Sequence, residues 1–385
     1  MKTLIISPDE ARYLALINQG LDNYRQHKTK KDLLNIITKL GYVQIDTISI
    51  IERAHKHILW TRFPGYRNDM LDELIDKDKK VFEFWDHAAA YLPMKFYRFS
   101  LPRKKMYAEK YKTWEKKNKK LLKYILERIS AEGPLQSRDF DDPKKRGLWW
   151  DWKPAKEGLE FLFHTGRLIA RARKNFQKVY DLPERFLTAA VNTEMPSYEE
   201  LAEHLIMKSI TSGGITAENE FTYLRYHNRN ITKKVLIDLT ENSKIIPVKI
   251  SNDEKTIYYS TTKILNKLNN AFKFSNDVYI LSPFDNLVIQ RGRLKKIFGY
   301  DYVIECYLPA HKRKFGYFCL PVLYGDKIAG KIDTRADRKT GELTVINEFW
   351  ETGVKTNKDF RNIYLNKLNE LALFAGCYIV KYNSK

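Results

Sequence analysis

A short polar pattern between residues 41 and 63 has the groups that a hydrolytic site needs. Gln44 and Asp46 flank Ile45 in a β-prone run. Because alternate side chains of an extended segment share a face, the amide and the carboxylate are expected to project together. Held side by side at a strand-to-helix junction, they could grip and polarise a water molecule. Gln44 and Asp46 are therefore our candidate catalytic residues.

A plainer interpretation of the same stretch is a helix cap. Apolar residues such as Ile51 and Ile58 recur at helical spacing, which predicts a helix from Thr47 onward. Aspartate and threonine are favoured at helix N-caps, so Asp46 or Thr47 could simply begin that helix. A Gln-x-Asp triplet has low specificity by itself, and both interpretations remain open at this point.

Further polar and aromatic side chains are predicted to surround this pair. The candidates for the surround are Arg53, His55, Trp60, Glu83 and His87. Arg53, His55, His57 and Arg62 would add positive charge around the carboxylate. For His87 an ordinary core histidine with a satisfied hydrogen bond is an equally open interpretation. The histidines lack the spacing to cysteines or carboxylates that a metal site requires, so we expect no metal.

The composition bounds the class of protein. The 385 residues include 68 Lys and Arg against 47 Asp and Glu, a formal charge of +21, which makes a polyanion such as DNA the first partner to consider. Cys306, Cys319 and Cys377 form no Cys-x-x-Cys pair, so neither a disulfide framework nor a zinc site is indicated. We expect a cytoplasmic protein, because no run approaches the ~20 apolar residues of a membrane span.

Helix, turn and hairpin signals divide the chain into four successive units. Residues 1–120 form a first helix-turn-helix unit with the Gln-x-Asp motif and a lysine-rich helix over 103–123. Residues 121–190 place helices before a β-hairpin over 168–180. Residues 191–275 repeat this order, with one helix expected over 216–225. The pattern predicts three tandem winged-helix units.

Residues 276–385 alternate like antiparallel strands. Strands are expected over 302–308, 315–323, 327–333 and 342–349, with a hairpin tip at 335–341 and a closing helix over 360–374. This unit is predicted to be a β-rich C-terminal domain covered by its helix. The fold class is therefore α+β, mainly helical.

Basic side chains are expected to contact DNA phosphates. The hairpin over 168–180 reads as a wing, whose arginines and lysine suit a minor groove or flanking phosphates. The DNA-binding candidates are Arg62, Arg171, Arg173, Lys174, Arg291 and Arg293. The lysine-rich helix over 103–123 is equally well explained as a solvated face.

Several of these stretches together resemble the AlkZ/YcaQ family of bacterial winged-helix DNA glycosylases. The stretches that carry the resemblance, in one order along the chain, are 43–47, 53–55, 60–62, 83–89, 133–135, 281–285, 302–309, 316–317, 320–323 and 325–326. The resemblance implies three winged helices and a β-domain in a C-shape around a basic DNA channel. It also implies that Gln44 and Asp46 are catalytic, and that the enzyme excises alkylated bases and unhooks interstrand crosslinks. Aspartate at position 46, where an antibiotic-resistance branch carries glutamine, favours a general repair role.

A single carboxylate is sufficient for this hydrolysis. A purine alkylated at N7 or N3 is already cationic, so it leaves without a strong general acid. Asp46 would stabilise the oxocarbenium-like sugar and activate water, and Gln44 would orient that water. A lyase would need a desolvated lysine nucleophile, which the sequence cannot nominate. We therefore expect a monofunctional glycosylase that uses no cofactor and acts as a monomer on double-stranded DNA.

Two other classes of protein compete. A winged-helix transcription regulator without catalysis explains the charge and the hairpins, but such a protein would usually dimerise on a palindromic sequence. A nuclease would need clustered carboxylates for Mg²⁺, and Asp69, Asp72 and Glu73 read better as surface acids.

Overall fold

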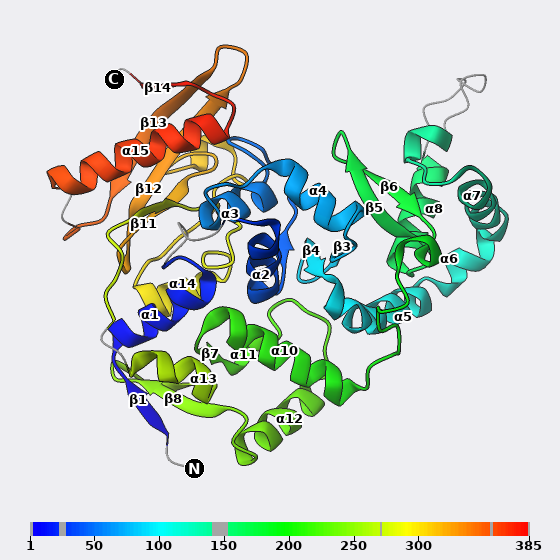
Figure 1. Cartoon of the computed structure of the whole chain (residues 1–385), viewed down its shortest axis with the longest axis horizontal. Helices are drawn as coiled ribbons and strands as arrows, with labels where there is room; N and C mark the ends of the chain where they lie inside the picture. Colours follow the sequence, from blue (N-terminus) through cyan, green and yellow to red (C-terminus); the bar gives the residue numbers. More distant parts are fainter. Residues whose placement is uncertain (1–2, 23–27, 141–152, 270–271, 355–356, 384–385) are drawn as a thin grey trace. The chain divides into compact units, whose positions relative to one another are not determined.

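The computed structural model describes residues 3–22, 28–140, 153–269, 272–354 and 357–383, with 46% of the chain helical and 20% in strands (Figure 1). These residues form two compact units. The first unit comprises residues 1–66 and 202–385, and the second comprises 67–201. Both ends of the chain thus build one unit. The predicted division into four successive domains stays a prediction.

The helices of the first unit begin and end where local signals indicate. Ser7 caps α1, accepting a hydrogen bond from Glu10 N–H at 3.2 Å, and Gly20 ends it in the left-handed conformation. The helices are α1 (Pro8–Gln19), α2 (Lys30–Leu40), α3 (Ala54–Arg62), α10 (Tyr198–Gly213), α11 (Glu218–Phe221), α12 (Arg229–Glu241), α13 (Thr262–Leu265), α14 (Arg291–Phe298) and α15 (Lys358–Phe374). The predicted closing helix over 360–374 is confirmed as α15.

Two sheets complete the first unit. One has the strand order β1-β8-β9-β7 and the other β10-β11-β12-β13-β14. Their strands are β1 (Leu4–Ile6), β7 (Thr216–Ala217), β8 (Ile246–Ile250), β9 (Asp253–Ser260), β10 (Val278–Ile280), β11 (Leu320–Tyr324), β12 (Lys327–Asp337), β13 (Glu342–Trp350) and β14 (Ile379–Tyr382). A further short strand, β2 (Val43–Gln44), carries the candidate glutamine. The predicted hairpins β8–β9 and β12–β13 are confirmed.

The second unit contains helices and two hairpins. Its elements are α4 (Asn68–Asp76), β3 (Val81–Trp85), β4 (Ala89–Pro93), the 3₁₀ helix Met94–Ser100, α5 (Leu101–Lys110), α6 (Lys112–Lys117), α7 (Lys119–Glu132), the 3₁₀ turn Ser137–Phe140, α8 (Lys153–His164), β5 (Ile169–Lys174), β6 (Gln177–Asp181) and α9 (Pro183–Phe186). Asn175 and Phe176 both have positive φ at the β5–β6 turn, as a two-residue hairpin loop requires. The predicted hairpin over 168–180 is confirmed.

The sequence misplaced several element boundaries. The helix expected from Thr47 begins only at Ala54, and the helix over 103–123 is interrupted at Tyr111 and Asn118. The helix expected over 216–225 is limited to Glu218–Phe221, because the backbone leaves helical geometry at Thr222, where φ is -115°. In each case apolar residues continue at helical spacing through a stretch that is not helical.

Residues 302–308 form no strand, contrary to prediction. They lie in a loop that folds back on itself, because the Glu305 carboxylate accepts backbone N–H bonds from Lys314, Phe315 and Gly316 at 3.0, 2.8 and 3.1 Å. The alternation of residue types in this stretch therefore reflects a turn around one buried acid.

Within the described ranges no helix has both the length and the apolar character needed to cross a membrane. The main core of the first unit packs α1 and α10 against the β7–β9 sheet, with Leu14, Ile206, Ile210, Phe221 and Tyr258 among its buried side chains. Helix α11 therefore rests on this core.

Candidate active site

The candidate catalytic pair lies at the start of an irregular segment, residues 45–53, that runs from β2 to α3. The segment is tied to distant parts of the first unit at both ends. Before it, Asn286 Nδ2 donates to Tyr42 O at 3.1 Å. Within its second half, Ala336 N–H donates to Ile50 O at 3.4 Å, and the Arg338 guanidinium donates to Ile51 O. These bonds replace the helical bonds that the sequence predicts here.

Asp46 does not cap a helix. Arg53 occupies the N-cap position of α3, and Asp46 Oδ1 accepts a hydrogen bond from Ile48 N–H at 2.8 Å in a local turn. The side chain is half-buried. Burial raises the pKa of its carboxyl, while the N–H groups of Ile48 and Thr47 and the charge of Arg53 act in the opposite direction. The capping interpretation is therefore wrong, and the carboxylate keeps partial access to solvent.

Gln44 and Ile45 are more deeply placed than Asp46. Gln44 is 5% exposed at the end of β2, and Ile45 is 6% exposed. The amide is therefore held in a packed position directly before the half-buried carboxylate. Its orientation toward Asp46 stays a prediction.

Two residues whose pKa values are affected by the charge of Asp46 were not singled out individually by sequence reasoning. Burial raises the pKa of the Cys306 thiol, and the negative charge of Asp46 raises it further. The Tyr307 hydroxyl also has a raised pKa, through burial and the charges of Cys306 and Asp46. The Tyr307 side chain is 73% exposed. The loop 302–309 was among the stretches that carried the family resemblance, which was its only signal.

The predicted surround on α3 is largely buried. His55 is 4% exposed, and Trp60 stacks on Phe374 of α15 with ring centroids 4.9 Å apart. His57 Nε2–H donates to Ile280 O at 2.9 Å, and burial lowers its pKa to about 4. The expectation that His57 supplies positive charge is therefore wrong, because the ring is neutral. Arg53 Nη1 donates to Thr47 O at 3.2 Å, beside the candidate pair.

Glu83 and His87 belong to the second unit and have partners there. Both oxygens of Glu83 accept bonds from Arg173, at 2.7 Å each, and its side chain is 3% exposed. His87 Nδ1 lies 3.5 Å from an Asp86 carboxylate oxygen. Their place in the active-site surround stays a prediction.

Two of the predicted DNA contacts are wrong. Arg62 is fully buried and forms a bidentate ion pair with Asp285 at 2.7 and 2.8 Å. The Arg293 side chain is 9% exposed and pairs with Glu220 at 2.6 Å. Neither guanidinium is placed to reach a phosphate, because each is enclosed within the first unit and paired with a carboxylate there.

The other basic candidates differ in how far they are engaged. Arg173 pairs with Glu83, and Arg171 pairs with Asp76 at 2.6 Å. Arg291 donates to Pro283 O at 2.7 Å, and its guanidinium lies 4.6 Å from the Tyr302 ring centroid. Lys174, at the end of β5, is exposed. Of this set Lys174 has the best geometry for a phosphate contact.

The acids considered for a nuclease are dispersed. Asp69 pairs with Arg67 at 3.2 Å and Glu73 with Lys77 at 2.8 Å, both on the surface. In the part of the chain that the structure describes, no three His, Cys, Asp or Glu side chains gather as metal ligands would. The nuclease interpretation therefore has no supporting geometry.

Comparison with known proteins identifies the class, that of DNA glycosylases. The family model described as "DNA glycosylase AlkZ-like" matches residues 37–369, a span that includes Gln44, Asp46 and the loop 302–309. The chain belongs to this AlkZ-like family, as the sequence resemblance predicted. A DNA glycosylase acts on DNA and is a hydrolase, which fits the basic composition.

The fold is similar to that of the Streptomyces sahachiroi DNA glycosylase AlkZ. The two structures match with a TM-score of 0.66 over 99% of this chain and 100% of that one, at 14% sequence identity. At this identity the likeness concerns the fold. The match extends over nearly the whole length of both chains.

Proposed function

We propose that this chain hydrolyses the N-glycosidic bond of purines alkylated at N7 or N3 in duplex DNA, with Asp46 as the catalytic carboxylate. The observation that carries the proposal is the environment of Asp46. It is half-buried, and backbone N–H groups of its own turn, those of Ile48 and Thr47, hold it in place. A half-buried carboxylate held in this way can still meet a water molecule or the sugar.

The reaction needs little acid catalysis. Because the alkylated base is cationic, it departs with the electrons of the glycosidic bond and becomes neutral. The ionised Asp46 stabilises positive charge on the sugar and removes a proton from the attacking water, which bonds to the anomeric carbon. Gln44, packed directly before it, orients that water. The products are the free base and an abasic site.

We propose monofunctional action, and the position of Lys104, one of several buried lysines, is consistent with it. Burial lowers the pKa of Lys104 to about 7, which would suit a nucleophilic amine. Lys104 is however 6% exposed, and its ammonium lies between the rings of Tyr97 and Phe84, 4.1 and 4.8 Å from their centroids. An amine enclosed in this way cannot attack a sugar, so we propose base release without strand cleavage.

The architecture we propose is three winged helices and a β-rich domain around a basic channel, acting as a monomer. The hairpins β5–β6 and β8–β9 each follow helices in the order that a winged helix requires. An open channel would admit a base tethered to the opposite strand, which cannot flip freely. On this basis we extend the proposed substrates to interstrand crosslinks.

The decisive experiment measures release of 7-methylguanine from alkylated duplex DNA under single-turnover conditions. We expect Asp46→Asn to reduce the rate by about 100-fold or more, the usual contribution of a general base. Gln44→Ala should reduce it less, while both variants keep the DNA affinity of the wild type. A wild-type protein that releases no base from methylated or crosslinked DNA would favour the regulator interpretation instead.

A further inference from the structure

Leu224 is an exposed leucine with a strained backbone conformation. Leu224 has a φ of 53° and its side chain is 68% exposed. Bulky residues rarely adopt positive φ, and such strain persists only where surrounding structure enforces it. Exposure of an aliphatic side chain to water does not stabilise the fold. The strained conformation therefore suggests that Leu224 binds a partner.

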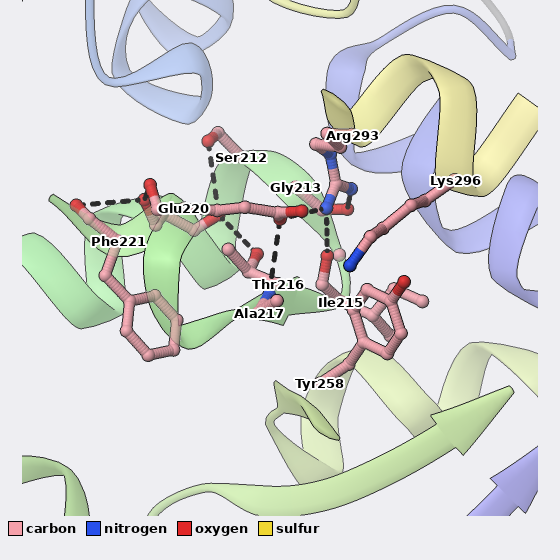
Figure 2. Close-up of polar contacts among 12 residues, drawn as sticks. Ser212, Gly213, Ile215, Thr216, Ala217, Glu220, Phe221, Tyr258, Arg293 and Lys296 are labelled. Carbon is pink, nitrogen blue, oxygen red and sulfur yellow. Dashed lines mark hydrogen bonds and ion pairs between the residues drawn. The ribbon is translucent and has the colours of Figure 1, made fainter. Parts of the chain in front are cut away.

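The turn that carries Leu224 is built on a rigid platform. Figure 2 shows the Glu220 carboxylate of α11 between the Arg293 guanidinium, at 2.6 Å, and the backbone N–H of Ala217, at 3.2 Å. Arg293 also donates to Gly213 O and Ile215 O, at 2.7 Å each. Phe221, the last residue of α11, is fully buried. The chain therefore leaves α11 in a fixed direction.

Directly after α11, residues 222–225 form a tight turn that contains Leu224. Arg225 N–H donates to Thr222 O at 2.9 Å, and this bond fixes the tip of the turn 222–225. The platform and the turn together present the leucine at a defined place on the surface. The strain is therefore imposed by structure on both sides of the residue.

The neighbours of Leu224 reach the candidate active site. The Arg225 guanidinium lies 5.3 Å from the ring centroid of Tyr42, two residues before Gln44. A cavity of about 20 Å³ is lined by Tyr42 together with Glu220, Arg225 and Arg293. The leucine thus directly precedes a residue that contacts the segment leading into Gln44.

We infer that Leu224 is a wedge that enters the base stack next to the damaged nucleotide and holds the duplex open at Asp46. The inference rests on the proposed function and adds a positioning residue to it. Proteins that distort DNA insert apolar side chains between base steps in this manner. Arg225 would hold the adjacent phosphate while the leucine separates the bases.

The test separates unstacking from base release. A duplex carrying 2-aminopurine beside a tetrahydrofuran abasic analogue reports unstacking by a rise in fluorescence, and it needs no catalysis. We expect the wild type to produce this rise and Leu224→Gly to lose it. Release of 7-methylguanine should fall at least about tenfold in Leu224→Gly, since unstacking one base step requires a few kcal/mol. Leu224→Met should keep both activities.

Two comparisons make the result specific. Glycine accepts a positive φ, so Leu224→Gly should melt at the wild-type temperature or above it, which excludes a folding defect. Leu373→Ala, at an equally exposed leucine on α15, should match the wild type in fluorescence and in rate, whereas Leu224→Ala should not. A fluorescence rise that persists in Leu224→Gly, or that is absent in the wild type, would overturn the wedge even if base release proceeds. If no protein releases base, and the fluorescence rise is lost only in Leu224→Gly and Leu224→Ala, the glycosylase proposal fails and the wedge stands.

Discussion

Asp46 owes its chemistry to the turn that holds it. Its Oδ1 accepts a hydrogen bond from Ile48 N–H in a local turn and not at the start of a helix, and the group is half-buried. Burial without a salt bridge in direct contact raises its pKa, because the charged form loses hydration. The pKa of an exposed surface aspartate is not raised in this way, because its charged form stays hydrated.

The raised pKa predicts a pH dependence of base release. The ionised carboxylate is the active form, so the rate should fall as the pH drops, with a midpoint above 3.8, the ordinary value for aspartate. Single-turnover rates between pH 4 and 8, with circular dichroism at each pH, would measure it. Gln44→Ala should keep this midpoint. A midpoint below 3.8, or the same acid limb in Asp46→Asn, would contradict the assignment.

The same pKa has a consequence for stability. Because the folded pKa is raised, the folded protein binds this proton more tightly than the unfolded chain does. The ionised Asp46 therefore destabilises the fold above its folded pKa, and this effect disappears at pH values below its unfolded pKa. Asp46→Asn should then unfold no more easily than the wild type at pH 7. Lost activity without lost stability would mark a functional residue.

At the scale of an element, the hairpin β5–β6 shows how strand geometry sorts basic residues. Arg171 and Arg173 share one face and meet the acids Asp76 and Glu83, while Lys174 stands exposed at the turn. The sequence makes these three side chains look equivalent. The ion pairs of Arg171 and Arg173 give these two residues a structural role, and Lys174 is left as the candidate for a DNA contact.

Lys174 and Arg173 should therefore respond differently to substitution. We expect Lys174→Ala to reduce the slope of log affinity against log salt by about 0.9, the effect of one phosphate contact, with unchanged stability. Arg173→Ala should keep the slope and lower the free energy of unfolding by about 3 kcal/mol, because the buried Glu83 loses its partner. Fluorescence anisotropy across a salt series and urea unfolding measure the two effects. The reverse result would show that Arg173 is the residue that faces DNA.

At the scale of the whole molecule, the first unit is joined by contacts between the two ends of the chain. Strand β1 pairs in parallel with β8, with Leu4 opposite Val248. Arg62 and Asp285, 223 residues apart, form a fully buried ion pair. These contacts bring α3 and the segment that follows β10 into one core, next to the candidate pair.

The buried pair should control stability rather than DNA affinity. Replacing one member leaves a charge without compensation, so Arg62→Met should lower the free energy of unfolding by about 3–5 kcal/mol. The double variant Arg62→Met/Asp285→Leu should recover most of this loss, because neither charge remains. Urea denaturation of the three proteins tests the coupling. Equal destabilisation by the single and double variants would show that the pair itself contributes little.

The sequence determined what depends on near neighbours. Caps such as Ser7, the turn at Asn175, the periodicity of α15 and the motif around Gln44 and Asp46 are all local signals, and they indicated the family, most elements and the candidate pair. These features need only a few consecutive residues to be formed, so a single sequence suffices to read them.

Only the tertiary structure decided which polar side chains are engaged by distant partners and which can take part in binding or catalysis. Nothing near Arg62 in the sequence shows that Asp285 neutralises it, and nothing near Thr47 shows that Ala336 and Arg338 hold the following segment out of a helix. The effect of the Asp46 charge on the pKa of Cys306 and the strain at Leu224 have the same origin. Each depends on the packing of residues far apart in the chain, whose energies exceed local preference and leave no trace in local spacing.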